Sequence, residues 1–247
     1  MENTKSQMLK LIDNMLTANV LQRTDLKRFT ANLDHSPDDP EMLRLELESW
    51  YRGMGVEQII GRKFELSPCP FTRDEVCSAR ENGEIILCIP KGITREQIGE
   101  LTRISSWALK DPLVTAATEQ EDCWMRTSAS LSPSFMKQTG IEVAHLAEDK
   151  GELNFSLERY LLFVSRVRFL TGSTPDSEYW IWLPRGRYDR SGMLIAGFDR
   201  NGRFNAHGWM PQFSASFLGA RFGTPPGSAA KAQSSIRSAS DLSFSKI

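Results

Sequence analysis

The stretch MLIAGFDRNGRFNAHGW, residues 193–209, decides the fold class of this chain. Two runs rich in apolar residues, Met193–Phe198 and Arg203–Trp209, flank the tetrapeptide Asp199-Arg200-Asn201-Gly202. Asp at the first turn position, Asn at the third and Gly at the fourth favour a type I turn followed by a left-handed glycine. We therefore predict a β-hairpin, and with it a β-rich carboxyl-terminal half.

The region before this hairpin predicts a long helix and a further strand. Apolar residues recur at helical spacing within Ser156–Leu170, and Gly172 stands where a helix commonly ends. Other apolar side chains extend around the remaining circumference, so we expect a helix largely enclosed by the domain. Glu178–Leu183 predicts a strand, and Phe213–Phe222 can add another.

The sequence between residues 63 and 107 alternates between strand and helix signals. Lys63–Leu66 alternates as a strand does, and Glu84–Pro90 is a short apolar run typical of a buried strand. Capping boxes, in which a threonine and an acidic or amide side chain satisfy free N–H groups, begin helices at Thr72 and Thr94. This order predicts one short βαβ segment. Further on, Asp122–Ser130 predicts a strand, and Ser132-Pro133 predicts a helix start.

The amino-terminal region predicts two amphipathic helices. The first carries an apolar stripe of Met8, Leu11, Ile12, Met15 and Leu16. The second begins at Pro40, whose missing N–H costs nothing at a helix start, and buries Leu43, Leu47, Trp50 and Tyr51.

The overall expectation is an α+β protein in three parts. Residues 1–58 form a helical region that either stands alone or packs on the main domain, and residues 59–222 form that domain. Residues 223–247, rich in Ser, Ala and Gly, predict a disordered tail because they bury too little to offset their ordering entropy. An alternative is that the amino-terminal helices dock on a partner.

Composition narrows the classes of partner. The net charge is -1, from 30 Lys plus Arg and 31 Asp plus Glu, which argues against a dedicated nucleic-acid-binding protein. The beginning of the chain is polar, and no apolar run approaches the ~20 residues that cross a bilayer. The four cysteines lack close CxxC spacing, so we expect free thiols, a cytoplasmic location and no metal site. No motif identifies a cofactor.

The densest set of functional residue types lies in the segment from Trp182 to Arg190, which we interpret as a loop. It places Arg185, Arg187 and Arg190 beside Trp182 and Tyr188. Arginine forks bind phosphate or carboxylate, and aromatic faces stack on rings. The leading hypothesis is a binding protein that uses these five residues for an anionic small molecule or protein partner. The simpler alternative is a connection whose arginines are solvated or locally paired.

An enzymatic alternative depends on the hairpin. With a two-residue period, His207 shares a face with Arg203, Asn205 and Trp209, and the opposite face carries Phe204, Ala206 and Gly208. A histidine with a carboxylate partner can act as a general base, so His207 with Asp199 would suit a small-molecule hydrolase or transferase. No motif supplies a nucleophile, and Cys123 would need a histidine nearby in space to act as one.

Overall fold

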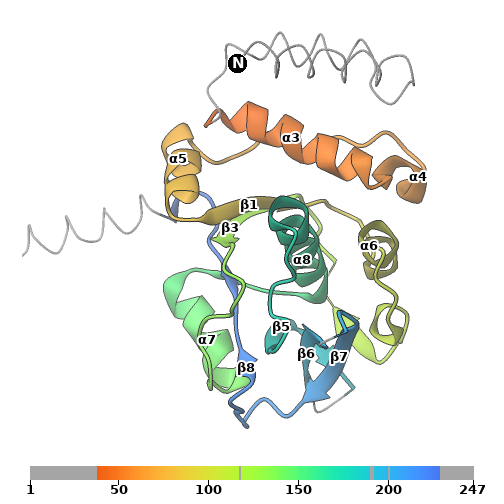
Figure 1. The fold of residues 1–247 in the computed structure, drawn as a ribbon, viewed down its shortest axis with the longest axis vertical. Coiled ribbons are helices and arrows are strands. Elements are labelled where there is room, and N and C mark those ends of the chain that lie inside the picture. The colour runs from red at the N-terminus through yellow and green to blue at the C-terminus, as the bar shows by residue number, and fades with distance from the viewer. Residues whose placement is uncertain (1–37, 117, 190–191, 200, 229–247) are drawn as a thin grey trace, which may run out of the picture.

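The computed structural model describes residues 38–116, 118–189, 192–199 and 201–228, and it confirms the α+β class (Figure 1). In chain order its elements are α3 (Pro40–Gly53), α4 (Val56–Ile60), α5 (Arg73–Glu81), β1 (Glu84–Ile89), α6 (Arg95–Thr102), the 3₁₀ helix η1 (Trp107–Leu109), β2 (Val114–Ala116), β3 (Cys123–Ser128), α7 (Gly140–Lys150), β4 (Leu153–Asn154), α8 (Leu157–Thr171), β5 (Trp180–Tyr188), β6 (Gly192–Phe198), β7 (Phe204–Trp209), β8 (Leu218–Gly219) and β9 (Phe222–Gly223).

Helix α3 begins at Pro40, as the sequence predicts. The Asp39 carboxylate accepts a hydrogen bond from the Glu41 N–H at 2.8 Å, with Pro40 as the first helical residue. Leu47, Trp50 and Tyr51 are buried in the same apolar core that contains α8. The second amino-terminal helix therefore packs against the main body, whereas the helix predicted at residues 8–16 lies outside the described residues.

The segment Lys63–Leu66, predicted as a strand, forms no strand with any of the described residues. Phe64 and Leu66 are buried as the alternation requires, yet helix side chains satisfy their backbone groups. The Glu57 and Glu48 carboxylates accept from the Phe64 and Leu66 N–H groups at 3.0 Å each. The prediction of a βαβ segment is therefore wrong: β1 pairs instead with β3, and the pairing is antiparallel.

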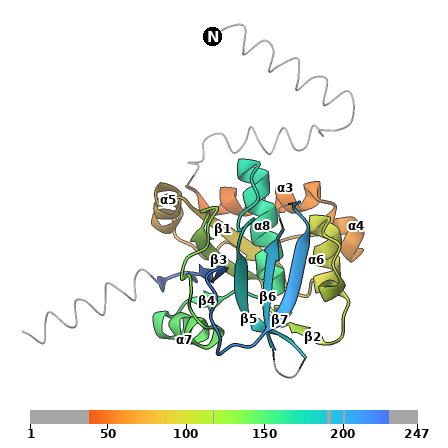
Figure 2. The same ribbon diagram turned by 60° about the horizontal axis from the view of Figure 1, so that its bottom comes forward.

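The main sheet has the order β2-β5-β6-β7, with β8 beside the start of β5. The predicted hairpin is β6–β7, and its turn is confirmed: Gly202 has φ 72° and donates to the Asp199 carbonyl at 2.9 Å. Phe204 and Ala206 point into the core with α8, so the two faces of β7 divide as predicted. Figure 2 shows this sheet in front of α8, with α6 beside β7.

The enclosed helix is confirmed as α8. Ser156 caps its first turn, and Gly172 ends it in the left-handed conformation at φ 71°. Ten of its residues are buried. One buried ion pair lies against it: Arg221 contacts Asp176 through two hydrogen bonds of 2.8 and 2.7 Å and stacks over Phe163 at 4.6 Å.

Two boundaries differ from the sequence expectation. No helix begins at Ser132-Pro133, because Ser134 bridges to Ala220, and α7 starts instead after the capping box of Thr139 and Glu142. At the other end, Gly223 belongs to β9, and the Gly227 N–H donates to Glu75 at 2.8 Å. Residues 223–228 thus pack on the domain, and the rest of the predicted tail lies outside the described residues.

No helix within the described ranges is both long enough and apolar enough to span a lipid bilayer.

Candidate ligand-binding surface

The segment from Trp182 to Tyr188 is a strand, which corrects our interpretation of it as a loop. It forms most of β5, and the register against β6 shifts between Leu183 and Arg187. Pro184 has no N–H to donate, so it fits a bulge better than a regular ladder. The bulge changes which face the following side chains occupy.

The five predicted ligand-binding residues are not brought together. Trp182 is 0% exposed, and its indole N–H donates to the Gln138 carbonyl at 3.0 Å, so it belongs to the core. Arg185 lies 3.7 Å from the Glu119 carboxylate, which the buried Arg159 also contacts at 2.8 Å. Arg187 is exposed and Tyr188 is half-buried. Arg190 lies outside the described residues.

His207 and Asp199, the predicted catalytic pair, lie apart along the hairpin. His207 pairs with Ile195, and Asp199 is four residues further along that side, about 13 Å of strand. The Asp199 carboxylate accepts from the N–H groups of Asn201 and Arg203, at 2.9 Å each, and so stabilises the turn. Among the described residues no carboxylate contacts the His207 ring. The general-base geometry is absent from this part of the chain.

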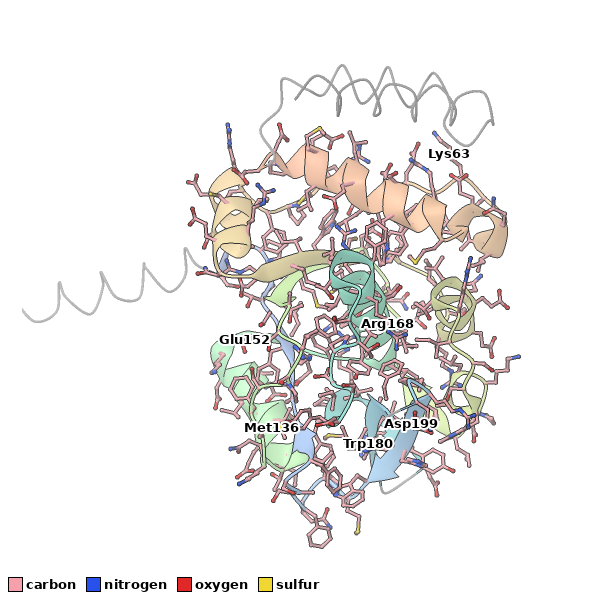
Figure 3. All side chains as sticks on the ribbon, viewed as in Figure 1. Lys63, Met136, Glu152, Arg168, Trp180 and Asp199 are labelled. Carbon is pink, nitrogen blue, oxygen red and sulfur yellow. The ribbon has the colours of Figure 1, made fainter. Side chains whose placement is uncertain are left out.

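His207 contacts two tryptophan rings instead. Its ring centroid lies 5.3 Å from that of Trp180 and 6.2 Å from that of Trp107. Trp107 also meets Tyr188 edge-on at 5.2 Å. We call these four residues, Trp107, Trp180, Tyr188 and His207, the aromatic surface. Figure 3 labels Trp180 near the start of β5 and Asp199 at the hairpin turn.

A glycine makes the contact between Trp180 and His207 possible. Gly197 pairs with Trp180 on one side and with Asn205 on the other, so at this level of the sheet β6 places no side chain between Trp180 and β7. A Cβ at Gly197 would meet the Tyr179 carbonyl at 2.4 Å, which leaves no room for a larger residue. The Trp180 ring therefore reaches across β6 towards His207.

Sequence reasoning did not single out Trp107, which follows the helix that the capping box at Thr94 predicts. In the structure α6 ends at Thr102, its C-cap residue Arg103 adopts φ 56°, and Ser106 caps the separate turn η1. Trp107 is consequently 42% exposed. The serine pair at 105–106 is the only local signal of this second start.

Two exposed cations are close in sequence to members of the aromatic surface. Arg187 precedes Tyr188 in β5, and Lys110 follows Trp107 by three residues. Neither makes an ion pair with any residue of the described ranges. Their charges are therefore available to an anionic group, which the paired guanidinium of Arg185 is not.

The thiols and acids lie elsewhere and serve the fold. Cys123 accepts a hydrogen bond from Arg159 at 3.2 Å, and burial raises the pKa of its thiol, which opposes reactivity at neutral pH. Asp122 accepts from the backbone N–H groups of Ser67 and Lys91 at 2.6 and 2.9 Å. No three metal-ligating side chains converge within the described residues.

Comparison with known proteins adds no assignment: no protein-family model, no curated protein and no solved structure matches this chain.

Proposed function

We propose that this protein is a binding protein whose aromatic surface takes an anionic ligand or partner that carries a flat ring. The observation that carries the proposal is the exposed His207 ring between Trp107 and Trp180, with Tyr188 edge-on to Trp107. Trp107 and His207 are exposed while Trp180 and Tyr188 are half-buried, so part of this aromatic area stays in water, as is common at interaction sites.

The two kinds of side chain have separate roles in this proposal. Trp107 and His207 stack on the ring, a contact worth about 1–3 kcal/mol for a base on an aromatic side chain. Arg187 and Lys110 attract the anionic group, and a charged hydrogen bond contributes about 1.5–3 kcal/mol. The sum corresponds to dissociation constants around the millimolar range for a small probe, and a larger partner would bind more tightly.

The test compares matched probes that differ only in charge. Ligand-observed NMR titrations would use adenosine monophosphate against adenosine, and O-phosphotyrosine against tyrosine. We expect each anionic probe to bind at least fivefold more tightly than its neutral counterpart. We also expect tryptophan fluorescence to change on binding. Comparing the affinities of the two probe pairs distinguishes a nucleotide-like ligand from a phosphorylated or acidic peptide.

Variants locate the site. Trp107→Ala should weaken both members of each probe pair, because it removes stacking. Arg187→Ala should weaken only the anionic member, because it removes charge. Phe169→Ala is the matched control, since Phe169 is an exposed aromatic residue on α8, outside the aromatic surface. Equal binding of charged and neutral probes, or full binding by Trp107→Ala, would refute the proposal.

The hydrolase or transferase hypothesis has weaker support. It requires a carboxylate within hydrogen-bond reach of His207, and within the described ranges Asp199 is committed to its own turn. The contacts of His207 with two indole rings favour recognition over proton transfer.

A further inference from the structure

Two hollows lie next to each other along α3, and we call them together the groove. One has a volume of about 330 Å³ and is lined by Trp50, Met54 and Phe169 among others. The other, of about 300 Å³, is lined by residues that include Leu43 and Leu170. Glu46 and Arg166 line both hollows and divide them. Figure 1 shows α3 crossing above α8 with α5 beside it.

Arg166 is buried in this groove with incomplete hydrogen bonding. Its side chain is only 4% exposed, and one nitrogen, Nη2, pairs with Glu46. Its Nε and Nη1 atoms have no hydrogen-bond partner among the described residues. The guanidinium lies 5.3 Å from the Trp50 ring and 5.5 Å from the Phe169 ring. A buried charge with free donors is unfavourable, so this site lacks an acceptor.

Exposed apolar side chains lie at the end of the groove formed by α8. Phe169 is 65% exposed and Leu170 is 47% exposed, although both lie in the last turns of a helix that is otherwise enclosed. The charged residues Glu46, Arg80 and Glu84 also line the groove. Apolar side chains beside charged ones, with one under-satisfied cation, suit an amphipathic helix that carries a carboxylate.

We propose that the occupant is the chain's own amino-terminal segment, Met8–Leu16, docked as a helix against α3 and α8. Its apolar stripe, predicted from the sequence, needs a surface of this kind. As a helix the segment would be about 14 Å long, and α3 between Leu43 and Gly53 is about 15 Å long, so the two match in length.

Charge and connectivity favour this segment over a separate partner. Asp13 lies three residues before Leu16 and so flanks the apolar stripe, where its carboxylate can reach Arg166. The described chain begins at Asp38, next to the start of α3. Residues 17–37 can extend to about 70 Å, far more than the groove requires. A tether of this kind holds the segment at a high effective concentration.

Photo-crosslinking in the full chain tests the contact directly. The photo-reactive analogue p-benzoyl-phenylalanine replaces Phe169, and mass spectrometry identifies the peptide that it captures. We expect capture of residues 8–16 on the same chain. The matched control places the analogue at Ile141, an exposed apolar position on α7, and should not capture that peptide. An equal mixture of ¹⁵N-labelled and unlabelled chains separates capture within one chain from capture between two.

Hydrogen exchange provides a second readout. In the unmodified chain, amides of residues 8–16 should exchange at least tenfold more slowly than in Ile12→Asp, which places a charge in the apolar stripe. Lys10→Asp introduces the same residue on the opposite face and should keep the protection. Unchanged exchange in α8 shows that the variants remain folded. Capture of other peptides alone, capture between chains, or equal exchange in Ile12→Asp and the unmodified chain would overturn the proposal.

Discussion

Replacing Asp176 with Asn should destabilise the protein strongly, although the two side chains have almost the same shape. Asp176 is 0% exposed and accepts two hydrogen bonds from Arg221, of 2.8 and 2.7 Å. It adopts φ 57°, a conformation that Asn tolerates nearly as well as Asp does. The substitution therefore removes the negative charge and keeps the backbone preference. What it leaves behind is a buried guanidinium with no counter-charge.

The expected cost follows from that stranded charge. Breaking one side of a buried ion pair typically costs about 3–5 kcal/mol, because the remaining ion stays desolvated without compensation. Arg221 keeps its 2.8 Å hydrogen bond to the Ser130 carbonyl and its stacking over Phe163, so the lower half of that range is expected. Arg221→Met should then cost less when it is added to the Asp176→Asn variant than when it is made alone.

Urea unfolding followed by circular dichroism measures these differences. The control is Glu65→Gln, which breaks the exposed ion pair with Lys63 and should cost under about 1 kcal/mol. If Asp176→Asn also costs under about 1 kcal/mol, the guanidinium is not stranded by the loss. The ion pair would then contribute little to holding Arg221 against the body of the protein.

Further predictions concern two carboxyl groups and two glycines. Burial raises the pKa of the Glu158 carboxyl in the folded protein. The stability contributed by this carboxyl is therefore fully present below its ordinary pKa and is lost as the pH rises through the raised pKa. Glu158→Gln should accordingly raise the melting temperature at pH 8 and not at pH 4. The pKa of Glu142 shifts in the opposite direction, because hydrogen bonds from Thr139 lower it. Glu142→Gln should therefore lower the melting temperature at pH 8 only. A Cβ at Gly140 would meet the Trp182 ring at 3.0 Å, and Gly140→Ala should cost about 1–3 kcal/mol in urea unfolding. Gly53→Ala, which meets nothing within 4 Å, should be neutral or stabilise by up to about 1 kcal/mol. A higher melting temperature at pH 4 in Glu158→Gln, or equal costs for the two alanines, would contradict these arguments.

Signals confined to a few neighbouring residues predicted the structure well. The capping boxes at Thr72 and Thr94 are both formed, and the turn at Asp199–Gly202 has the expected conformation. Each depends on hydrogen bonds between residues at most four positions apart, so the sequence contains both partners. The capping box at Thr139 carries the same signal, and it predicts the start of α7 better than Ser132-Pro133 does.

Strand pairing was less predictable because the partners are distant in sequence. Lys63–Leu66 has the alternation of a strand, and its two apolar residues are buried as that alternation requires. Its backbone groups nevertheless bond to the side chains of Glu48 and Glu57 on helices. Local periodicity reports which side chains are buried and does not report what satisfies the backbone.

The position of the aromatic surface could not be predicted from local sequence either. The sequence concentrated arginines and aromatic residues between Trp182 and Arg190, but the strand places Trp182 in the core and pairs Arg185 with Glu119. The surface instead joins His207 to Trp107, one hundred positions earlier, which is exposed because α6 stops at Thr102. A recognition site built from rings on separate elements depends on where each helix ends and where each strand bulges. If the proposed binding site is correct, substitutions that alter those two features should change its affinity although they replace no contact residue.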